Sequence, residues 1–324
     1  MNIETVYQSV ASDLQAVEKE LDKNLQSEIP LVTALGKYIL NSGGKRFRPL
    51  LLILSARLCG YRGDEHIPLA CILEFIHTAT LLHDDVVDNA KIRRGNSSAN
   101  TIWGNQASIL IGDLFFAQSF YLIGKIKNWR ILNVLTEATT KLAEGEILDL
   151  VMIGDLSSNE AKYLTTINYK TASLIQAACH IGAILGNVDL AKEKSMKSFG
   201  KNLGIAYQLI DDTLDYISTE NELGKSIGKD LEEGKVTLPL IYTLQKSSPQ
   251  DRKFIASTLQ QKKITKKSLS QVLNLINQYQ GIEYTIKKAK QYALNAKKQL
   301  AQFPFSPDKE ALLTITNYVI NRRH

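Results

Sequence analysis

Two clusters of aspartates, each with the spacing Asp-Asp-x-x-Asp, are the residues of this sequence that are best suited to chemistry. In chain order they are Asp84, Asp85, Asp88, Asp211, Asp212 and Asp215. Each cluster follows an apolar stretch with helical periodicity, so its first and last aspartates share one face of a helix. Like charges beside an apolar core repel one another, and a divalent cation relieves that repulsion. Oxygen ligands favour magnesium, which also takes phosphate oxygens. A solvent-exposed acidic helix end is the alternative for either cluster alone.

Basic residues lie close in sequence to both clusters and in one earlier loop. The loop, residues 43–49, leads into a predicted helix start, and helix starts favour anions. The basic residues of interest are Lys45, Arg48, Arg93, Arg94, Lys225 and Lys235. Each alone could be surface charge. Together with the carboxylates they predict a diphosphate site, because Arg binds phosphate with two hydrogen bonds and Lys acts as a point charge.

Four polar residues inside apolar helical stretches are further candidates. His77 precedes Asp84 by seven residues and therefore lies on nearly the same face of the predicted helix. It is either a substrate contact or a histidine of the apolar core. Lys170 and Thr171 interrupt a long apolar stretch, where a buried lysine needs an anion or extends to the surface. Gln208 stands one turn before the second cluster and could contact substrate or bond its own helix.

Helices must position these residues, because apolar residues recur at three- and four-residue spacing through most of the chain. The predicted helical stretches are 50–58, 67–88, 107–126, 131–151, 160–185, 191–217 and 238–244. Strand-like alternation is essentially absent, Gly95 is expected to end the helix of the first cluster, and turns are expected at 247–249 and 303–307. This pattern predicts one all-α domain, residues 1–324, built as a single large bundle of ten or more helices. The two clusters could face each other across such a bundle.

The composition narrows the classes of protein to consider. The chain has 324 residues, of which 44% are hydrophobic and 22% charged, and a net charge of +6, which suits a Lys-rich surface, an anionic substrate or a membrane surface. Nucleic acid is not expected as a partner, because no basic block alternates with aromatic residues. Three scattered cysteines without a CxxC pair argue against zinc and a disulfide framework. With no signal peptide and no apolar run of membrane-spanning length, we expect a cytoplasmic protein that could lie against a membrane.

The order of these motifs resembles the trans-polyprenyl diphosphate synthases, and most closely the bacterial long-chain type such as octaprenyl diphosphate synthase. The resemblance covers nearly the whole chain. It rests on Gly43-Gly44-Lys45-x-x-Arg48-Pro49, on Leu81 to Asp88 with Arg93-Arg94-Gly95, on Gly145-Glu146, on Lys170-Thr171-Ala172, on Tyr207 to Asp212 and on Leu223-Gly224-Lys225 through Lys235. One residue departs from the family: Asp149 occupies a position where the family often has Gln.

The resemblance implies a role for each candidate residue. Asp84, Asp88 and Asp211 would hold magnesium on an allylic diphosphate, two or three ions per active site, with the other three aspartates in support. That diphosphate would also contact Arg93, Lys170 and Lys235, with Thr171 and Gln208 near the reacting carbons. Isopentenyl diphosphate would be held by Lys45, Arg48, His77 and Arg94, with Lys225 in the same cationic lining.

The implied fold is an isoprenoid synthase-like bundle with a central cavity, and the implied activity is prenyl transfer. An allylic diphosphate such as farnesyl diphosphate would ionise, condense with isopentenyl diphosphate and lose a proton. The product would be a long all-trans chain, octaprenyl diphosphate, that supplies a quinone side chain. The implied assembly is a homodimer, with membrane contact during product release. The alternatives are a shorter-chain synthase, a terpene cyclase or a non-catalytic partner subunit.

Product length should depend on the side chains that precede the first cluster. Ala79 and Thr80, five and four residues before Asp84, are small and should let a chain longer than fifteen carbons pass. The floor of the cavity is expected on the helix that includes Phe116, Phe120 and Ile123, although any one of these could be an ordinary core residue.

Overall fold

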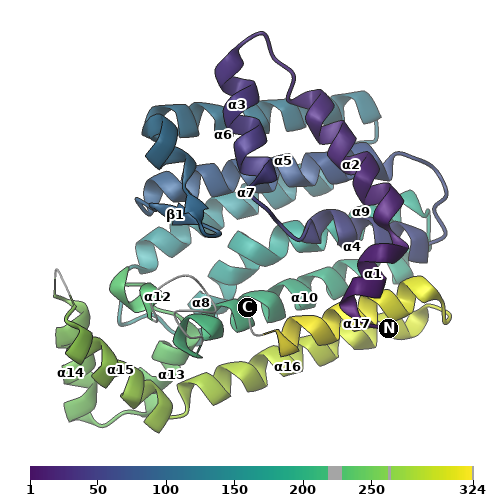
Figure 1. Ribbon diagram of the computed structural model, residues 1–324. Helices are drawn as coiled ribbons and strands as arrows, with labels where there is room; N and C mark the ends of the chain where they lie inside the picture. Colours follow the sequence, from purple (N-terminus) through teal and green to yellow (C-terminus); the bar gives the residue numbers. More distant parts are fainter. Residues whose placement is uncertain (218–227, 262–263, 323–324) are drawn as a thin grey trace. The chain divides into compact units, whose positions relative to one another are not determined.

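The computed structural model describes residues 1–217, 228–261 and 264–322 (Figure 1). Packing divides the chain into two units, each of which collects segments that are distant in sequence. The first unit contains residues 1–139, 177–197 and 302–314, and the second contains residues 140–176, 198–301 and 315–324. The prediction of one domain over residues 1–324 stays a prediction.

The described chain is helical nearly throughout, as predicted. The helices that lie wholly in the first unit are α1 (Ile3–Ser9), α2 (Ala11–Asn24), α3 (Pro30–Asn41), α4 (Phe47–Leu58), α5 (His66–Val87) and α6 (Ala99–Ile126). Those that lie wholly in the second unit are α8 (Glu160–Ile167), the π-helix η1 (Asn168–Ala172), α12 (Lys229–Glu232), α13 (Leu238–Lys246), α14 (Pro249–Leu259), α15 (Lys266–Gln278) and α16 (Gly281–Gln299). Segments of both units are contributed by α7 (Trp129–Met152), α9 (Ser173–Leu185), α10 (Leu190–Ile217), the 3-10 turn η2 (Leu300–Gln302) and α17 (Pro307–Asn321).

Helix α5 is the centre of the first unit and contacts α2, α4 and α6. It is apolar nearly all round, as predicted, and the ring of Phe75 packs 5.1 Å from that of Phe115 on α6. A partly buried ionic bridge adds to this packing: Arg46, just before α4, donates to Glu18 on α2 and to Glu74 on α5, the latter at 2.7 Å. Arg46 therefore connects α2 and α5 to the start of α4. This structural role belongs to Arg46, and its neighbours Lys45 and Arg48 remain the candidates for substrate binding.

The segment that follows α5 corrects two expectations. The helix ends at Val87 with Asp88 as its C-cap, eight residues before Gly95, which therefore does not end it. A short hairpin follows, in which strand β1 (Ile92–Arg93) pairs antiparallel with β2 (Asn96–Ser97). Arg94 and Gly95 form the two-residue turn with φ values of 51° and 79°. Two positive φ values are what a tight hairpin turn requires, and glycine adopts them without strain. The hairpin is too short to give the alternating pattern that reveals a strand in a sequence.

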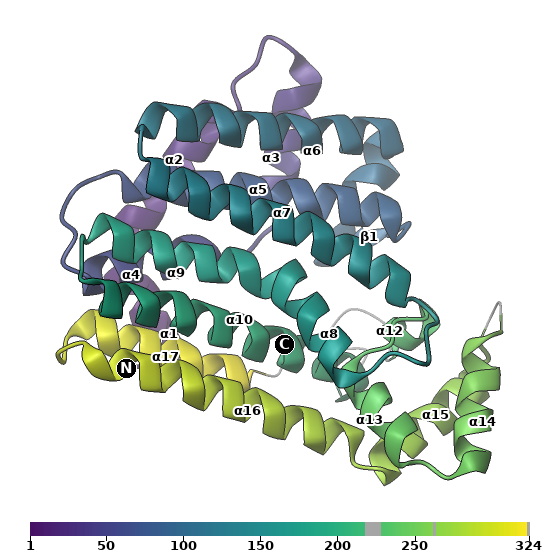
Figure 2. The ribbon, with the colours of Figure 1, turned by 180° about the vertical axis from the view of Figure 1, so that it is seen from behind.

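In the second unit, α13 packs against α8, α15 and α16, with α14 beside α15 (Figure 2). A buried apolar cluster joins these helices, and it includes Tyr163, Leu238, Ile241, Val272 and Ile276. Turns separate α13 from α14 and η2 from α17 at the positions predicted from proline. This unit also contains the π-helix η1, which is one turn of wider winding inside the 160–185 stretch that was predicted to be continuously helical.

Helix α6 bears on the expectation that no apolar run reaches membrane-spanning length. Its 28 residues are divided by a kink at Gly104, where φ is 83° and ψ is 161°, so the part after the kink begins close to the predicted residue 107. Helix α6 is the one helix in the described part of the chain that could cross a membrane by length and composition. Some of its apolar side chains, such as Ile111 and Phe115, are buried in the first unit, whereas Leu110 and Tyr121 are exposed.

Candidate functional site

The three aspartates of the first cluster have different surroundings at the end of α5. Asp84 is half-buried and Asp88 exposed, whereas Asp85 is fully buried. The guanidinium of Arg93 donates to Asp85 Oδ1 at 2.7 Å, and the Asn100 amide donates to the Asp85 backbone oxygen at 3.0 Å. Asp85 thus fastens the hairpin and the start of α6 to the end of α5. The two outer carboxylates are more accessible, which suits ligands for a cation.

Three predicted arginines of the first unit, Arg48, Arg93 and Arg94, lie near enough to His77 to act on its charge. Burial lowers the pKa of His77 well below its ordinary value of 6.5, and the charges of Arg48, Arg94 and Arg93 lower it further. The guanidinium of Arg94 also lies against Gly44, where a β-carbon would come within 2.8 Å of Nη1. His77 is therefore neutral at physiological pH, and it stands among cations that can bind a phosphate group.

The loop before α4 is attached to the N-terminal helix. The hydroxyl of Tyr7 donates to the backbone oxygen of Lys45 at 2.5 Å, and the Lys45 side chain itself is exposed. Gly43 in this loop has a φ of 87°, and Gly44 leaves room for Arg94. Arg48 belongs to the first turn of α4 instead of the loop.

In the second cluster, Asp212 is the buried aspartate. It accepts hydrogen bonds from the hydroxyl of Tyr163 at 2.5 Å and from the amide of Gln208 at 2.6 Å. Gln208 in turn accepts from Thr171 at 2.7 Å, so the two predicted residues meet in one network and Gln208 also bonds within its own helix. Burial raises the pKa of Asp212 to about 7, with further increases from the charges of Asp211 and Asp149.

Acidic groups are crowded on the far side of this cluster. The carboxylate of Asp215 accepts from the backbone N–H of Asp230 at 3.1 Å. Burial raises the pKa of Asp230 well above its ordinary value, and the charges of Asp215 and Asp212 add to the increase. The Lys235 ammonium pairs with Glu233 at 2.8 Å, and the backbone N–H of Lys235 donates to the Asp230 carbonyl oxygen. Carboxylates whose ionisation is opposed by burial and by one another's charges fit the donor set of a divalent cation.

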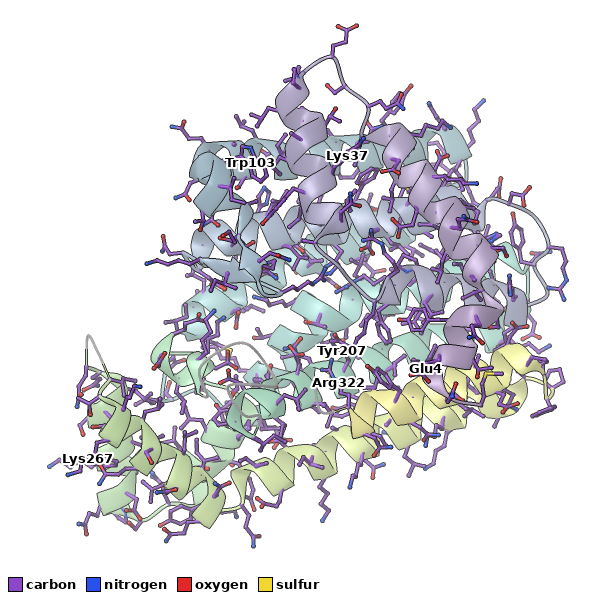
Figure 3. All side chains as sticks on the ribbon, in the orientation of Figure 1. Glu4, Lys37, Trp103, Tyr207, Lys267 and Arg322 are labelled. Carbon is purple, nitrogen blue, oxygen red and sulfur yellow. The ribbon has the colours of Figure 1, made fainter. Side chains whose placement is uncertain are left out.

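Asp211 has a partner that the sequence reasoning missed. Arg322, near the C-terminus, donates to Asp211 Oδ1 at 3.0 Å and to the backbone oxygen of Tyr207 at 2.9 Å. Its guanidinium also stacks 3.9 Å from the centre of the Tyr207 ring, and the two side chains are seen together in Figure 3. Only the basic character of the last residues could have suggested this, because no spacing in the sequence links them to residue 211.

Lys170 is held by two carboxylates of α7. Its ammonium lies 2.6 Å from Glu146 and 2.8 Å from Asp149, the residue that departs from the family pattern. The lysine is half-buried, so it is paired with anions rather than extended into water. Glu146 and Asp149 lie three residues apart on one face of the helix, and this spacing explains how both reach the same ammonium.

Two residues of the predicted motifs are not found among the site residues described above. Lys225 lies outside the described residues. His83, which lies within the first motif, faces α6, where its Nε2 lies 3.2 Å from the Ile109 carbonyl oxygen and 3.4 Å from Asp113. In the part of the chain that the structure describes, no three acidic, histidine or cysteine side chains converge as a metal site by themselves. A metal ion at either cluster would therefore need further ligands, such as water or phosphate oxygens.

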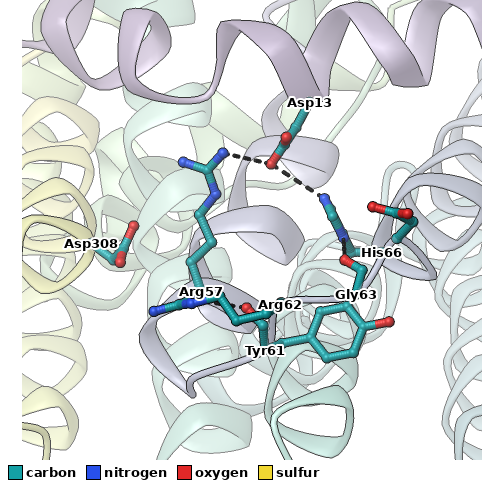
Figure 4. A pocket seen from close by; sticks show the side chains of 9 residues that line it. Asp13, Arg57, Tyr61, Arg62, Gly63, His66 and Asp308 are labelled. Carbon is teal, nitrogen blue, oxygen red and sulfur yellow. Dashed lines mark hydrogen bonds and ion pairs between the residues drawn. The ribbon is translucent and has the colours of Figure 1, made fainter.

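Two pockets of the first unit differ in character. The larger, with a volume of about 440 Å³, is lined by Asp13, Arg57, Arg62, His66 and Asp308 among others, and by none of the predicted site residues (Figure 4). The smaller, of about 10 Å³, lies between α5, α6 and α7. Its lining includes Ile72, Ile76, Phe120 and Ile123, so two of the three predicted floor residues surround it. The third, Phe116, lies near the His83 ring instead.

The chain is similar to known proteins over its whole length. A family model described as polyprenyl synthetase matches residues 29–276. Octaprenyl diphosphate synthase of Escherichia coli (strain K12) is 38% identical over 322 residues, which cover 99% of either chain. An all-trans-nonaprenyl-diphosphate synthase (geranyl-diphosphate specific) of Rhodobacter capsulatus is 36% identical, with 97% of this chain and 96% of that one covered.

A solved structure agrees with these relatives and with the predicted fold. A polyprenyl synthase from Caulobacter crescentus, complexed with calcium and isoprenyl diphosphate, superposes with a TM-score of 0.95 at 38% identity, and 100% of this chain and 98% of that chain are covered. The predicted family, the all-α isoprenoid synthase-like fold and the prenyltransferase class are confirmed. The chain belongs to the polyprenyl synthetase family of prenyltransferases.

Proposed function

We propose that this protein is a long-chain all-trans polyprenyl diphosphate synthase that adds isopentenyl diphosphate units to an allylic diphosphate such as farnesyl diphosphate. The observation that carries the proposal is that each Asp cluster is accompanied, within its own unit, by the cations that a diphosphate needs. We further propose octaprenyl diphosphate as the product, to be used as a quinone side chain. The octaprenyl relatives support that length, and the nonaprenyl relative makes a nine-unit product the nearest competitor.

In the first unit, the residues around His77 are proposed to bind isopentenyl diphosphate. Lys45, Arg48 and Arg94 would provide positive charge, and the neutral imidazole would donate one hydrogen bond. The depressed pKa of His77 supports this assignment, because burial and the neighbouring arginines keep its proton off at neutral pH. The homoallylic substrate would then be held by its diphosphate, with its double bond free to react.

The allylic diphosphate is proposed to bind through the aspartates and three cations. Magnesium ions, two or three per active site, would be held by Asp84, Asp88 and Asp211, with Asp85, Asp212 and Asp215 in support. Arg93, Lys170 and Lys235 would contact the diphosphate itself, with Thr171 and Gln208 near the reacting carbons. Lys225 is assigned to the cationic lining on resemblance alone. Burial, with the charges of neighbouring carboxylates, raises the pKa of Asp212 and Asp230, and a cation at the second cluster would relieve this cost.

The chemistry proposed is ionisation, condensation and elimination. Bound metal would supply neutralisation of the diphosphate as it leaves C1 of the allylic substrate. The chain's own Arg93, Lys170 and Lys235 stabilise the same developing charge. The allylic cation is attacked by the double bond of isopentenyl diphosphate, and the proton that is then lost passes to the departing diphosphate. Apolar residues of α5 keep water away from the cation.

Product length is proposed to depend on the buried side of α5. Ala79 and Thr80 are both buried and small, and the cavity lined by Ile76, Phe120 and Ile123 lies one turn and more further along the same helix. A growing chain that passes Ala79 and Thr80 would enter this region and widen it. The central cavity expected from the resemblance belongs to the same proposal.

Assembly is proposed to be a homodimer formed through α6. The apolar side chains that this helix exposes include Ile109, Leu110, Leu114, Phe120 and Tyr121, which gather on one face. Exposed apolar surface of this kind is typical of interfaces between subunits. Contact with a membrane during product release is proposed as well, since the product carries a long hydrocarbon chain.

One assay tests the proposed function. The purified protein is incubated with magnesium, labelled isopentenyl diphosphate and farnesyl diphosphate, and the products are sized by chromatography. We expect the enzyme to add several isopentenyl units and to form a main product with eight isoprene units. The addition of a single unit would instead indicate a shorter-chain synthase. A cyclic hydrocarbon product would indicate a terpene cyclase, and the absence of any reaction would indicate a non-catalytic partner subunit. The Asp84→Asn variant, with the carboxylate neutralised at unchanged size, should lose at least about 100-fold in kcat.

A further inference from the structure

We propose that Tyr163 is a positioning residue for the reaction, because its hydroxyl begins a chain of hydrogen bonds that ends at Thr171. The hydroxyl of Tyr163, on α8, donates to Asp212 Oδ2 at 2.5 Å. The amide of Gln208 donates to the other oxygen, Asp212 Oδ1, at 2.6 Å, and the Thr171 hydroxyl donates to Gln208 Oε1 at 2.7 Å. The four residues belong to the second unit. The inference rests on the proposed function, which assigns Thr171 and Gln208 to the reacting carbons and gives Tyr163 no role.

The carboxylate of Asp212 decides the direction of these bonds. The oxygens of an ionised carboxylate only accept hydrogen bonds, so the NH2 side of the Gln208 amide, and not its oxygen, must face Asp212. The amide oxygen is thereby turned toward Thr171. A threonine hydroxyl has one proton, and Thr171 donates it to Gln208. The lone pairs of the Thr171 hydroxyl oxygen are therefore what this side chain offers to any other group.

Tyr163 holds Asp212 in the orientation that this direction requires. Its hydroxyl occupies Oδ2 and so leaves Oδ1 to Gln208. Burial raises the pKa of Tyr163 well above 10, so the hydroxyl keeps its proton and acts as a donor. Without this donor, Asp212 Oδ2 would be buried with no hydrogen bond from the tyrosine, and the carboxylate would turn to find another partner.

The tyrosine itself cannot move with the carboxylate. Its side chain is 3% exposed and belongs to the buried apolar cluster of the second unit. The start of α8 is also held, because Glu160 accepts from the hydroxyl of Tyr284 at 2.6 Å and pairs with Lys288 at 2.7 Å, both on α16. Packing and these two contacts fix α8, so the hydroxyl of Tyr163 is a stationary point from which the chain of hydrogen bonds is oriented.

The direction of the bonds matters when the allylic substrate ionises. The bond between C1 and the diphosphate oxygen breaks with both electrons leaving on the diphosphate, so positive charge develops on the allylic carbons. A hydroxyl lone pair stabilises that charge, whereas an O–H that pointed the same way would oppose it. A dipole that is oriented beforehand needs no reorganisation when the charge forms. Tyr163 acts on this step through Asp212 and Gln208, without touching the substrate.

Steady-state kinetics of the full-length protein test the inference, with magnesium, farnesyl diphosphate and labelled isopentenyl diphosphate. A pH of about 8 keeps Asp212 ionised, because burial raises its pKa to about 7. Tyr163→Phe, which removes only the hydroxyl, should lower kcat about tenfold. Because binding of the ground state is untouched, KM for both substrates and the affinity for farnesyl S-thiolodiphosphate, an analogue that ionises poorly, should change by less than about twofold.

A matched control and a double-mutant cycle separate positioning from a general loss of structure. Tyr279→Phe is the control, because Tyr279 donates to Asp251 at 2.7 Å in the same unit but outside the proposed site, and it should keep the wild-type kcat. In a Thr171→Ala background no hydroxyl remains to be oriented, so Tyr163→Phe should lower kcat by less than about twofold further. In a Thr171→Ser background, which keeps the hydroxyl, the loss of about tenfold should return.

Three results would overturn the positioning role: a wild-type kcat in Tyr163→Phe, a loss confined to KM, or an equal loss of kcat with and without the Thr171 hydroxyl. Thermal unfolding identifies a variant that does not fold. If Tyr163→Phe is such a variant, Asp212→Asn replaces it, because an amide at this position lets Gln208 turn. Its loss of kcat should again shrink in the Thr171→Ala background, and an undiminished loss there would count against the chain of hydrogen bonds.

Failure of the proposed function gives a different result, since the wild type itself would then not elongate farnesyl diphosphate. Urea unfolding decides the chain of hydrogen bonds in that event. The destabilisation caused by Tyr163→Phe and that caused by Thr171→Ala should be non-additive in the double variant, because both residues belong to one network. Additive losses would show that the two residues are not connected through Asp212 and Gln208.

Discussion

At the level of single residues, the aspartates of the two clusters are not equivalent. Asp85 and Asp212, the middle residue of each motif, are buried and hold neighbouring groups: Arg93 in one case, and Tyr163 with Gln208 in the other. The outer residues Asp84 and Asp88 are more accessible, and Asp211 is half exposed beside Arg322. A spacing motif in the sequence specifies that three carboxylates are adjacent, but their burial decides which of them can reach a cation.

Replacement of Gly145 by a larger residue should disturb the backbone at Lys170. A β-carbon there would lie 2.3 Å from the Lys170 backbone nitrogen, and backbone cannot move aside as a flexible side chain can. We expect Gly145→Ala to lower the free energy of unfolding by about 1–3 kcal/mol, as overpacking does, and Gly145→Ser to lower it further. Chemical denaturation measures both, and an alanine variant as stable as the wild type would show that η1 and α7 do not touch here.

His77 predicts a pH dependence of stability. Its folded pKa is lowered well below 6.5, so below that pH the unfolded chain binds the proton that the folded protein does not take up. Its contribution to stability is therefore present above pH 6.5 and is lost as the pH falls toward the folded pKa. We expect the melting temperature of His77→Gln to fall less than that of the wild type between pH 7 and pH 5. Equal losses in the two proteins would contradict the burial of a neutral imidazole among arginines.

At the level of elements, α5 combines two tasks along its length. Its last turn presents the first Asp cluster, and the preceding turn carries the small buried residues Ala79 and Thr80. Because α5 is rigid and buried on most sides, a larger side chain one turn before Asp84 cannot turn away into solvent. The distance from the reacting carbon to such an obstruction would then set the product length.

Ala79→Phe tests this view of α5. We expect the main product to shorten to about fifteen or twenty carbons, because the ring would fill the space next to Thr80. Sizing the products of the variant by chromatography measures the effect. Ala79→Ser, which adds one oxygen atom, is the control and should keep the wild-type product length. An unchanged length in the phenylalanine variant would show that the chain does not pass this position.

At the level of the whole molecule, the exposed face of α6 predicts the assembly. Leu110 is 66% exposed on that face, and a charge in the middle of an apolar interface is costly to bury. We expect Leu110→Glu to shift the protein from dimer to monomer in analytical ultracentrifugation, with at least a tenfold weaker association. Leu190→Glu is the matched control, because Leu190 is 70% exposed and lies on α10. If both variants sediment as the wild type does, α6 is not the interface.

Much of the site chemistry could be predicted from the sequence because it depends on residue types at helical spacing. Asp84 with Asp88, or Lys170 with Thr171, are close along one helix, so their proximity needs no knowledge of the fold. The helical nature of the chain followed from periodicity in the same way, and its boundaries were predicted to within a few residues for α5, α7 and α10. For α6 the predicted start at 107 lies close to the kink at Gly104, and the helical residues before that kink were not predicted.

The sequence by itself determined the helical class, the family and the set of acidic and basic residues, since each of these depends on composition, order or local spacing. Only the tertiary structure decided which partners those residues have. Arg322 reaches Asp211 across more than a hundred residues, Asp149 joins Glu146 on Lys170, and burial makes Asp85 and Asp212 differ from their neighbours. The physical reason is that burial and long-range pairing arise only when distant segments pack together, and no local pattern along the chain encodes the outcome.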